Sequence, residues 1–155
     1  MEQLLAVIIT WLAVESGLPV TQNYPRIELA TSAAMETLRR EASTTGGPQA
    51  GATGIGSRAN PSAGDGVFAV YDDRSRTIYL HEGWNSANPA DSSLLVHEMV
   101  HHLQNVADVT FACAEEREKD AYRAQRNWLE IFGTTLENEF GIDAMTVMVR
   151  TNCMH

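Results

Sequence analysis

Apolar residues recur at helical spacing in three long stretches of the chain. The first stretch, residues 4–14, is followed by turn-forming residues, a pattern typical of a buried core helix that ends there. The other two stretches predict helices over about residues 93–107 and 114–132. A shorter helix is expected to run through residue 40, and a final helix is expected over residues 142–149. Helices are therefore expected to dominate the fold.

Capping residues mark the ends of these helices. Ser, Thr, Asp and Asn side chains satisfy free N–H groups in a first turn, and glycine commonly follows a last turn. The expected caps are Thr31 or Ser32, Asp91 or Ser92, Thr134 with Glu137 in a capping box, and Gly133 at a C-terminal end.

Three shorter segments have the pattern of β-strands. Residues 26–30 alternate between polar and apolar side chains, and residues 67–71 and 77–80 flank a polar turn, which predicts a hairpin. Residues 41–66 are rich in Gly, Ser, Thr, Ala and Pro, and we interpret them as a flexible loop, either without a role or serving as a lid or cleavable segment. The expected fold is a single helix-rich α+β domain over residues 1–155, with a sheet of about three strands.

Composition narrows the class of protein. A chain of 155 residues, of which 44% are hydrophobic, has the length of one globular domain and is unlike collagen-like, disordered and disulfide-framework chains. Its formal net charge of −9 argues against nucleic acid and against an anionic membrane surface as partners. The apolar stretch 4–14 is far shorter than the ~20 residues that span a bilayer, so no membrane insertion is expected.

The two cysteines, Cys113 and Cys153, are compatible with one disulfide bond that closes the C-terminal region onto the helix following residue 112. Such a bond would indicate a periplasmic or secreted protein, whereas free thiols would indicate a cytoplasmic one. The sequence leaves both alternatives open.

The residues that carry chemistry are His97-Glu98-x-x-His101, in the middle of the expected helix 93–107. Residues four apart lie on one face of a helix, so both imidazoles can bind one metal ion, while Glu98 projects about 100° round the helix toward a water on that ion. Zinc accepts imidazole and carboxylate ligands, keeps a position open for water and lowers the pKa of that water to about 7. The motif therefore predicts zinc-assisted hydrolysis.

A third ligand is expected from helix 114–132, and Glu118 is the best placed of its acids. At about 100° per residue, Glu118 is at the centre of the apolar face, whereas Glu116 and Asp120 point nearly opposite. Glu115 lies about 60° away and is the reserve candidate. A carboxylate on an apolar face is costly unless it is paired or binds a metal. The same inward face is expected to hold Ala121, Tyr122, Gln125, Trp128, Leu129 and Phe132.

These residues resemble the gluzincin branch of the zincin-like metallopeptidases. In that family the His-Glu-x-x-His helix is followed by a glutamate helix, and Glu118-Lys119-Asp120-Ala121-Tyr122 matches its motif, with Tyr122 where many relatives carry Asp or Asn. The wider run over residues 67–132 is similar to small bacterial zincin-like proteins. The resemblance implies a minimal zincin-like domain.

The resemblance also implies roles for individual residues. His97, His101 and Glu118 would bind Zn²⁺, and Glu98 would take a proton from zinc-bound water and pass it to the leaving amine. The substrate would be a peptide or protein that pairs by β-augmentation with residues 77–80 as the edge strand. The residue that stabilises the oxyanion is not identified, and Tyr122 is expected either to orient a ligand or to pack.

Three alternatives stay open. The chain could be a catalytically inactive zinc-binding interaction module, although a structural site has no need of Glu98 as a base. It could be a latent protease covered by residues 41–66 or by its C-terminal tail, or a helical protein without metal. The remaining histidines, His81, His102 and His155, are expected at the surface or, for His102, in local hydrogen bonds.

Overall fold

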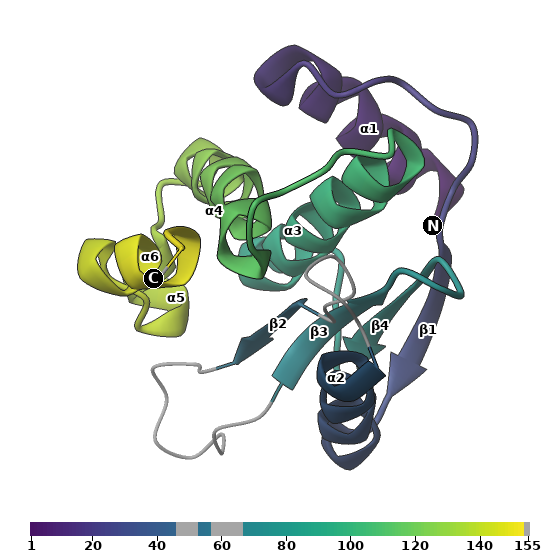
Figure 1. The fold of residues 1–155 in the computed structure, drawn as a ribbon. Coiled ribbons are helices and arrows are strands. Elements are labelled where there is room, and N and C mark those ends of the chain that lie inside the picture. The colour runs from purple at the N-terminus through teal and green to yellow at the C-terminus, as the bar shows by residue number, and fades with distance from the viewer. Residues whose placement is uncertain (46–52, 57–66, 154–155) are drawn as a thin grey trace.

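The computed structural model describes residues 1–45, 53–56 and 67–153, and in these residues it contains six helices and one four-stranded sheet (Figure 1). In chain order the elements are α1 (Glu2–Ser16), β1 (Arg26–Ala30), α2 (Ser32–Thr45), β2 (Thr53–Gly56), β3 (Val67–Asp72), β4 (Thr77–His81), α3 (Pro89–Val106), α4 (Ala114–Ile131), α5 (Leu136–Phe140) and α6 (Ala144–Thr151). The expected helix-rich α+β class is confirmed.

The sheet has the strand order β1-β4-β3-β2. β1 runs parallel to β4, and β3 is antiparallel to both of its neighbours. β4 therefore lies inside the sheet, and the expectation that residues 77–80 form a free edge strand is wrong. The reason is the long-range pairing of β1 with β4, which uses the backbone groups that an edge strand would leave open and which no local pattern reveals.

Part of the stretch 41–66 has regular structure, so its interpretation as one long loop is wrong. α2 continues to Thr45, and β2 pairs with β3 to add a fourth strand. Glycine-rich segments have low strand propensity, so pairing with β3 rather than local preference forms β2. The other parts of the expected loop, residues 46–52 and 57–66, lie outside the described residues.

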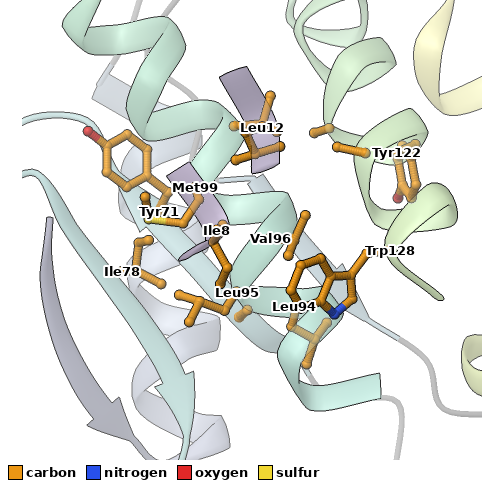
Figure 2. Packing of buried hydrophobic residues seen from close by; sticks show 14 of the residues in the cluster. Ile8, Leu12, Tyr71, Ile78, Leu94, Leu95, Val96, Met99, Tyr122 and Trp128 are labelled. Atoms are coloured by element: carbon orange, nitrogen blue, oxygen red, sulfur yellow. The ribbon is translucent and has the colours of Figure 1, made fainter. Parts of the chain in front are cut away.

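The sheet separates two groups of buried side chains. Tyr71 and Ile78, which lie opposite each other in the register of β3 and β4, point to the side covered by α3 and α1. Val70 and Tyr79, the next pair, point to the other side and pack near Met35 of α2. Figure 2 shows how α1 and α3 contribute to the larger group through Ile8, Leu12, Leu95, Val96 and Met99.

α3 lies in the centre of the fold, and every residue over 90–104 is buried. Its N-cap is Asn88, whose Oδ1 accepts two N–H groups of the first turn at 2.9 and 3.4 Å. The expected cap, Asp91 or Ser92, is therefore wrong. Pro89 takes the first helical position, where no N–H partner is needed, and the helix begins a turn earlier than expected.

Asp91 instead connects the end of β4 to the start of α3. Its carboxylate accepts the backbone N–H of Asn85 at 2.9 Å and lies 3.1 Å from His81 Nε2. The side chain of His81 is only 16% exposed, so its expected place at the surface is incorrect.

The other helix ends agree in part with expectation. Thr31 Oγ1 accepts an N–H of the first turn of α2 at 3.2 Å, and Gly133 follows α4 with a φ of 72°, a conformation that glycine adopts without strain. The capping box of Thr134 with Glu137 is wrong, because Thr135 is the N-cap of α5. The final helix begins at Ala144 rather than at residue 142.

Cys113 and Cys153 form a disulfide bond, with their Cα atoms 5.8 Å apart. Cys113 is the N-cap of α4, and Cys153 follows α6, so the bond fastens the C-terminal segment to the start of α4. α6 packs along α4 in the same region (Figure 1). Among the described residues, no helix is both long and apolar enough to cross a membrane.

Loss of this bond is expected to lower the free energy of unfolding. The double variant Cys113→Ser/Cys153→Ser frees a loop that the disulfide closes across a sequence separation of 40, and a loss of about 2–4 kcal/mol is expected. Serine also caps helices well, so the change should spare α4 itself. Chemical denaturation of the oxidised wild type, the reduced wild type and the double variant measures this. Equal midpoints for all three would contradict the prediction.

Candidate metal centre

α3 and α4 bring His97, His101 and Glu118 together. One donor atom from each residue lies within 4.8 Å of the other two. His97 Nε2 is 3.0 Å from Glu118 Oε2, and His101 Nε2 is 3.4 Å from Glu118 Oε1. The three ligands expected from the sequence therefore meet at one place, between two packed helices.

The other acids of α4 do not take part. Asp120 pairs with Arg123 at 2.9 Å, and Glu116 accepts a backbone N–H at 2.7 Å. Within the described residues, neither of them nor Glu115 belongs to the metal-ligating cluster. Phe132, expected on the inward face, is 52% exposed because it follows the last residue of α4. The residues of α4 buried as expected are Ala121, Tyr122, Gln125, Trp128 and Leu129.

A glutamine side chain contacts each imidazole on the side away from Glu118. His97 Nδ1 lies 3.1 Å from Gln125 Oε1, and His101 Nδ1 lies 3.0 Å from Gln104 Oε1. Because a glutamine amide has an oxygen that accepts and a nitrogen that donates, its orientation decides which imidazole nitrogen carries the hydrogen.

The other contacts of the two glutamines fix that orientation. Gln104 Nε2 donates to the carbonyl oxygen of Arg117 at 3.1 Å, an atom that can only accept. Gln125 Nε2 donates to Ser93 Oγ at 3.2 Å, and the hydroxyl of Ser93 donates in turn to the carbonyl of Ala90 at 2.7 Å. Both glutamines therefore present oxygen to the histidines, and each Nδ1–H donates.

This arrangement turns the Nε2 lone pairs of His97 and His101 toward the carboxylate of Glu118. With neutral imidazoles all three groups are hydrogen-bond acceptors, so they repel one another unless a cation lies between them. Burial lowers the pKa of His101, which disfavours a proton as that cation. The buried donor set, two imidazole nitrogens and a carboxylate, fits Zn²⁺.

Glu98 follows His97 in the chain and is completely buried. Among the described residues, the cluster of potential ligands consists of His97, His101 and Glu118 and does not include Glu98. Both imidazole side chains are 0% exposed, whereas that of Glu118 is 16% exposed. Among the three ligands, solvent therefore reaches the centre at Glu118.

Tyr122 lies one turn after Glu118 and packs edge-to-face against His97, with the ring centroids 4.9 Å apart. Its hydroxyl accepts a hydrogen bond from Arg150 Nη1 of α6 at 2.9 Å. Burial raises the pKa of Tyr122, the contact with Arg150 opposes this, and the charges of Glu118 and Glu98 raise it further. Of the two interpretations of Tyr122 from sequence, packing against a ligand is the one its position supports.

An ion pair that the sequence does not predict connects the β3–β4 turn to both helices of the candidate metal centre. Arg117 donates to both carboxylate oxygens of Asp73 at 2.6 Å, and its Nη2 also donates to the carbonyl of His101 at 3.4 Å. The guanidinium is nearly buried, since Arg117 is 5% exposed. No local signal marks the pair, because its members are 44 residues apart.

His102 contacts β3 and the segment before β1 rather than the candidate metal centre, and it is fully buried, so its expected surface or local role is wrong. Its Nε2–H donates to the carbonyl of Asn23, and its Nδ1 accepts from the Tyr71 hydroxyl at 3.1 Å. Burial lowers the pKa of His102 and raises that of Tyr71 to about 12, so both are neutral at pH 7. This contact is structural. His155 lies outside the described residues.

The glutamine contacts predict an effect on metal affinity. Gln104→Leu and Gln125→Leu each remove the acceptor that fixes an imidazole, and zinc affinity is expected to fall about 10–100-fold. Competition with a chelator of known affinity measures the change, with the exposed Gln22→Leu as the matched control. Zinc binding as tight as in the wild type, in variants with an unchanged circular dichroism spectrum, would contradict the assignment.

Comparison with known proteins assigns the chain to a family but indicates no activity for it. Neither the curated proteins nor the solved structures include a match to the chain. One family model, described as "Domain of unknown function (DUF6647)", matches residues 1–155. The resemblance to gluzincins thus stays a prediction from the residues quoted above. The match extends over the whole sequence, and the chain therefore belongs to the DUF6647 family.

Proposed function

We propose that this protein is a zinc-dependent peptidase. The observation that carries the proposal is the convergence of His97 Nε2, His101 Nε2 and the Glu118 carboxylate, with both imidazoles oriented so that a cation is needed between them. The resemblance to gluzincins supports a peptide bond as the target. Glu98, which a purely structural zinc site would not need, supports hydrolysis over a binding role.

In this proposal each side chain has its own role. His97, His101 and Glu118 would hold zinc, which would act as a Lewis acid that polarises a carbonyl and makes water a better nucleophile near neutral pH. Glu98 accepts the proton of the attacking water and donates it to the leaving amine. The burial of Glu98 keeps that proton from exchanging with bulk solvent during the transfer.

We further propose that the protein works in an oxidising compartment, the periplasm or the extracellular space. The Cys113–Cys153 disulfide supports this location, since thiols in the cytoplasm are generally kept reduced.

The purified protein is expected to bind about one zinc ion per chain, measured by inductively coupled plasma mass spectrometry. Glu118→Ala removes the only carboxylate of the cluster and should lower the zinc content or the affinity strongly. Asp120→Ala is the matched control, because Asp120 is on the same helix but pairs with Arg123. Absence of zinc from the wild type, even after zinc is supplied at neutral pH, would overturn the proposed function.

Glu98→Gln keeps the shape of the side chain but cannot accept the proton. The variant should retain zinc, while kcat/KM for peptide hydrolysis falls by at least about 100-fold. A mixed peptide library with mass-spectrometric detection provides the assay, and the exposed Glu82→Gln is the control. Equal hydrolysis by wild type and Glu98→Gln would remove Glu98 from the mechanism. Zinc-loaded wild type that cleaves nothing would favour the inactive binding module.

A further inference from the structure

Arg150 of α6 lies close to the candidate metal centre. Its Nη1 donates to the hydroxyl of Tyr122 at 2.9 Å, and the ring of Tyr122 packs against His97 with centroids 4.9 Å apart. One side chain therefore separates the guanidinium from a metal ligand. This part of the site comes from a helix far along the chain from the His-Glu-x-x-His motif.

The partner of Arg150 is unusual for an arginine in this region. The arginines of α4 all have carboxylate partners: Arg117 with Asp73 at 2.6 Å, Arg123 with Asp120 at 2.9 Å and Arg126 with Glu130 at 3.9 Å. Within the described part of the chain, no carboxylate oxygen lies within 4.0 Å of Arg150. The chain carries 20 acidic and 11 basic residues, so it needs explanation that, within the described residues, the hydrogen bond of this half-buried guanidinium goes to a neutral phenol.

Arg150 is itself partly exposed, although its partner Tyr122 is buried. Glu118 is the only ligand of the three with an exposed part, and Tyr122 lies about 40° round α4 from it, one turn further on. The hydrogen bond from Arg150 uses a lone pair of the Tyr122 oxygen. In the described contacts the phenolic hydrogen is not donated elsewhere, so the two side chains together offer donors to an incoming anion.

A groove beside Tyr122 gives room for part of a substrate. It has a volume of about 470 Å³ and is bounded by α4, α5 and α6. Tyr122 lines it together with Val147 and Thr151 of α6 and Leu136 of α5. Arg150 does not line the groove itself and is joined to it by the hydrogen bond to Tyr122. This volume is in the range of sites that bind small molecules, and it accommodates one or two amino-acid residues.

We propose that Arg150 and the Tyr122 hydroxyl bind a carboxylate of the peptide substrate close to the bond that is cleaved. The carboxylate is either the C-terminal one or that of an Asp or Glu side chain. A guanidinium binds a carboxylate through short, charge-assisted hydrogen bonds, and a neighbouring phenol adds one more donor. The inference rests on the proposed function, because it names the substrate class of the same centre.

Matched peptides test the inference with the full-length, zinc-loaded protein. One peptide sequence is prepared with a free C-terminal acid and with a C-terminal amide. A second set consists of C-terminal amides that carry either Glu or Gln at each position in turn. The wild type is expected to prefer the carboxylate form by at least about tenfold in kcat/KM, as one charge-assisted hydrogen bond would give. Preference for acid over amide identifies the terminal carboxylate, and preference for Glu over Gln identifies a side chain.

Arg150→Gln should reduce this preference to about one while zinc content stays at one per chain, and Arg150→Lys should keep part of it. Arg123→Gln is the matched control: it removes a positive charge from the rim of the same groove, has no hydrogen bond to Tyr122, and should keep the preference. Equal cleavage of charged and neutral peptides by the wild type would overturn the inference. An equal loss for both peptide forms in Arg150→Gln would also overturn it.

A second readout separates this inference from the proposed function. If no peptide is cleaved, the peptidase proposal fails, and carboxylate binding is still measurable by NMR titration of the zinc-loaded protein with an N-acetylated dipeptide and with its amide. Shifts of the Arg150 side-chain signal with the acid alone would uphold the carboxylate site. The same shifts with acid and amide, or none with either, would overturn it.

Discussion

Two imidazole lone pairs and a carboxylate point at one another inside this protein, and this arrangement is stable only with a cation among them. The surrounding structure maintains it: α3 is buried over residues 90–104, so the imidazoles cannot turn to water, and Gln104 and Gln125 hold the Nδ1–H of each ring. The packed interior therefore favours a cation at this place, and the proposed zinc ion would supply it. This preference, rather than the motif alone, gives the metal-site proposal its physical basis.

The position of α4 depends on contacts that reach well beyond the metal ligands. Arg117 precedes Glu118 and binds Asp73 of the β3–β4 turn, so the sheet, α3 and the start of α4 are connected through one guanidinium. At the same end of α4, the Cys113–Cys153 bond holds the C-terminal segment. That segment also carries Arg150, which donates to the hydroxyl of Tyr122, so the disulfide lies in the same C-terminal segment as a residue that contacts the candidate site.

The order of the strands changes how a substrate can approach. β4 is enclosed by β1 and β3, so the strand that the family resemblance assigned to the substrate has no free edge. The proposed carboxylate site at Arg150 and the Tyr122 hydroxyl would place the substrate along α4 and α6 instead. Side-chain donors would then recognise the substrate in place of backbone pairing with residues 77–80.

Periodic spacing determined what the sequence alone predicts: most of the helices, the β3–β4 hairpin, and the two histidines with Glu118 on facing apolar stripes. Each of these features follows from a pattern that repeats every few residues, so the geometry of a single helix or strand is enough to predict it. Tertiary structure alone decided the rest. Four features belong to this group: the parallel pairing of β1 with β4, the ion pair of Arg117 with Asp73, the burial of His102, and the hydrogen bond of Arg150 to Tyr122. Each of them joins residues that are 28 to 79 positions apart in the chain. Such contacts depend on how the helices and strands pack against one another. The spacing of residues within a single helix or strand therefore does not predict them.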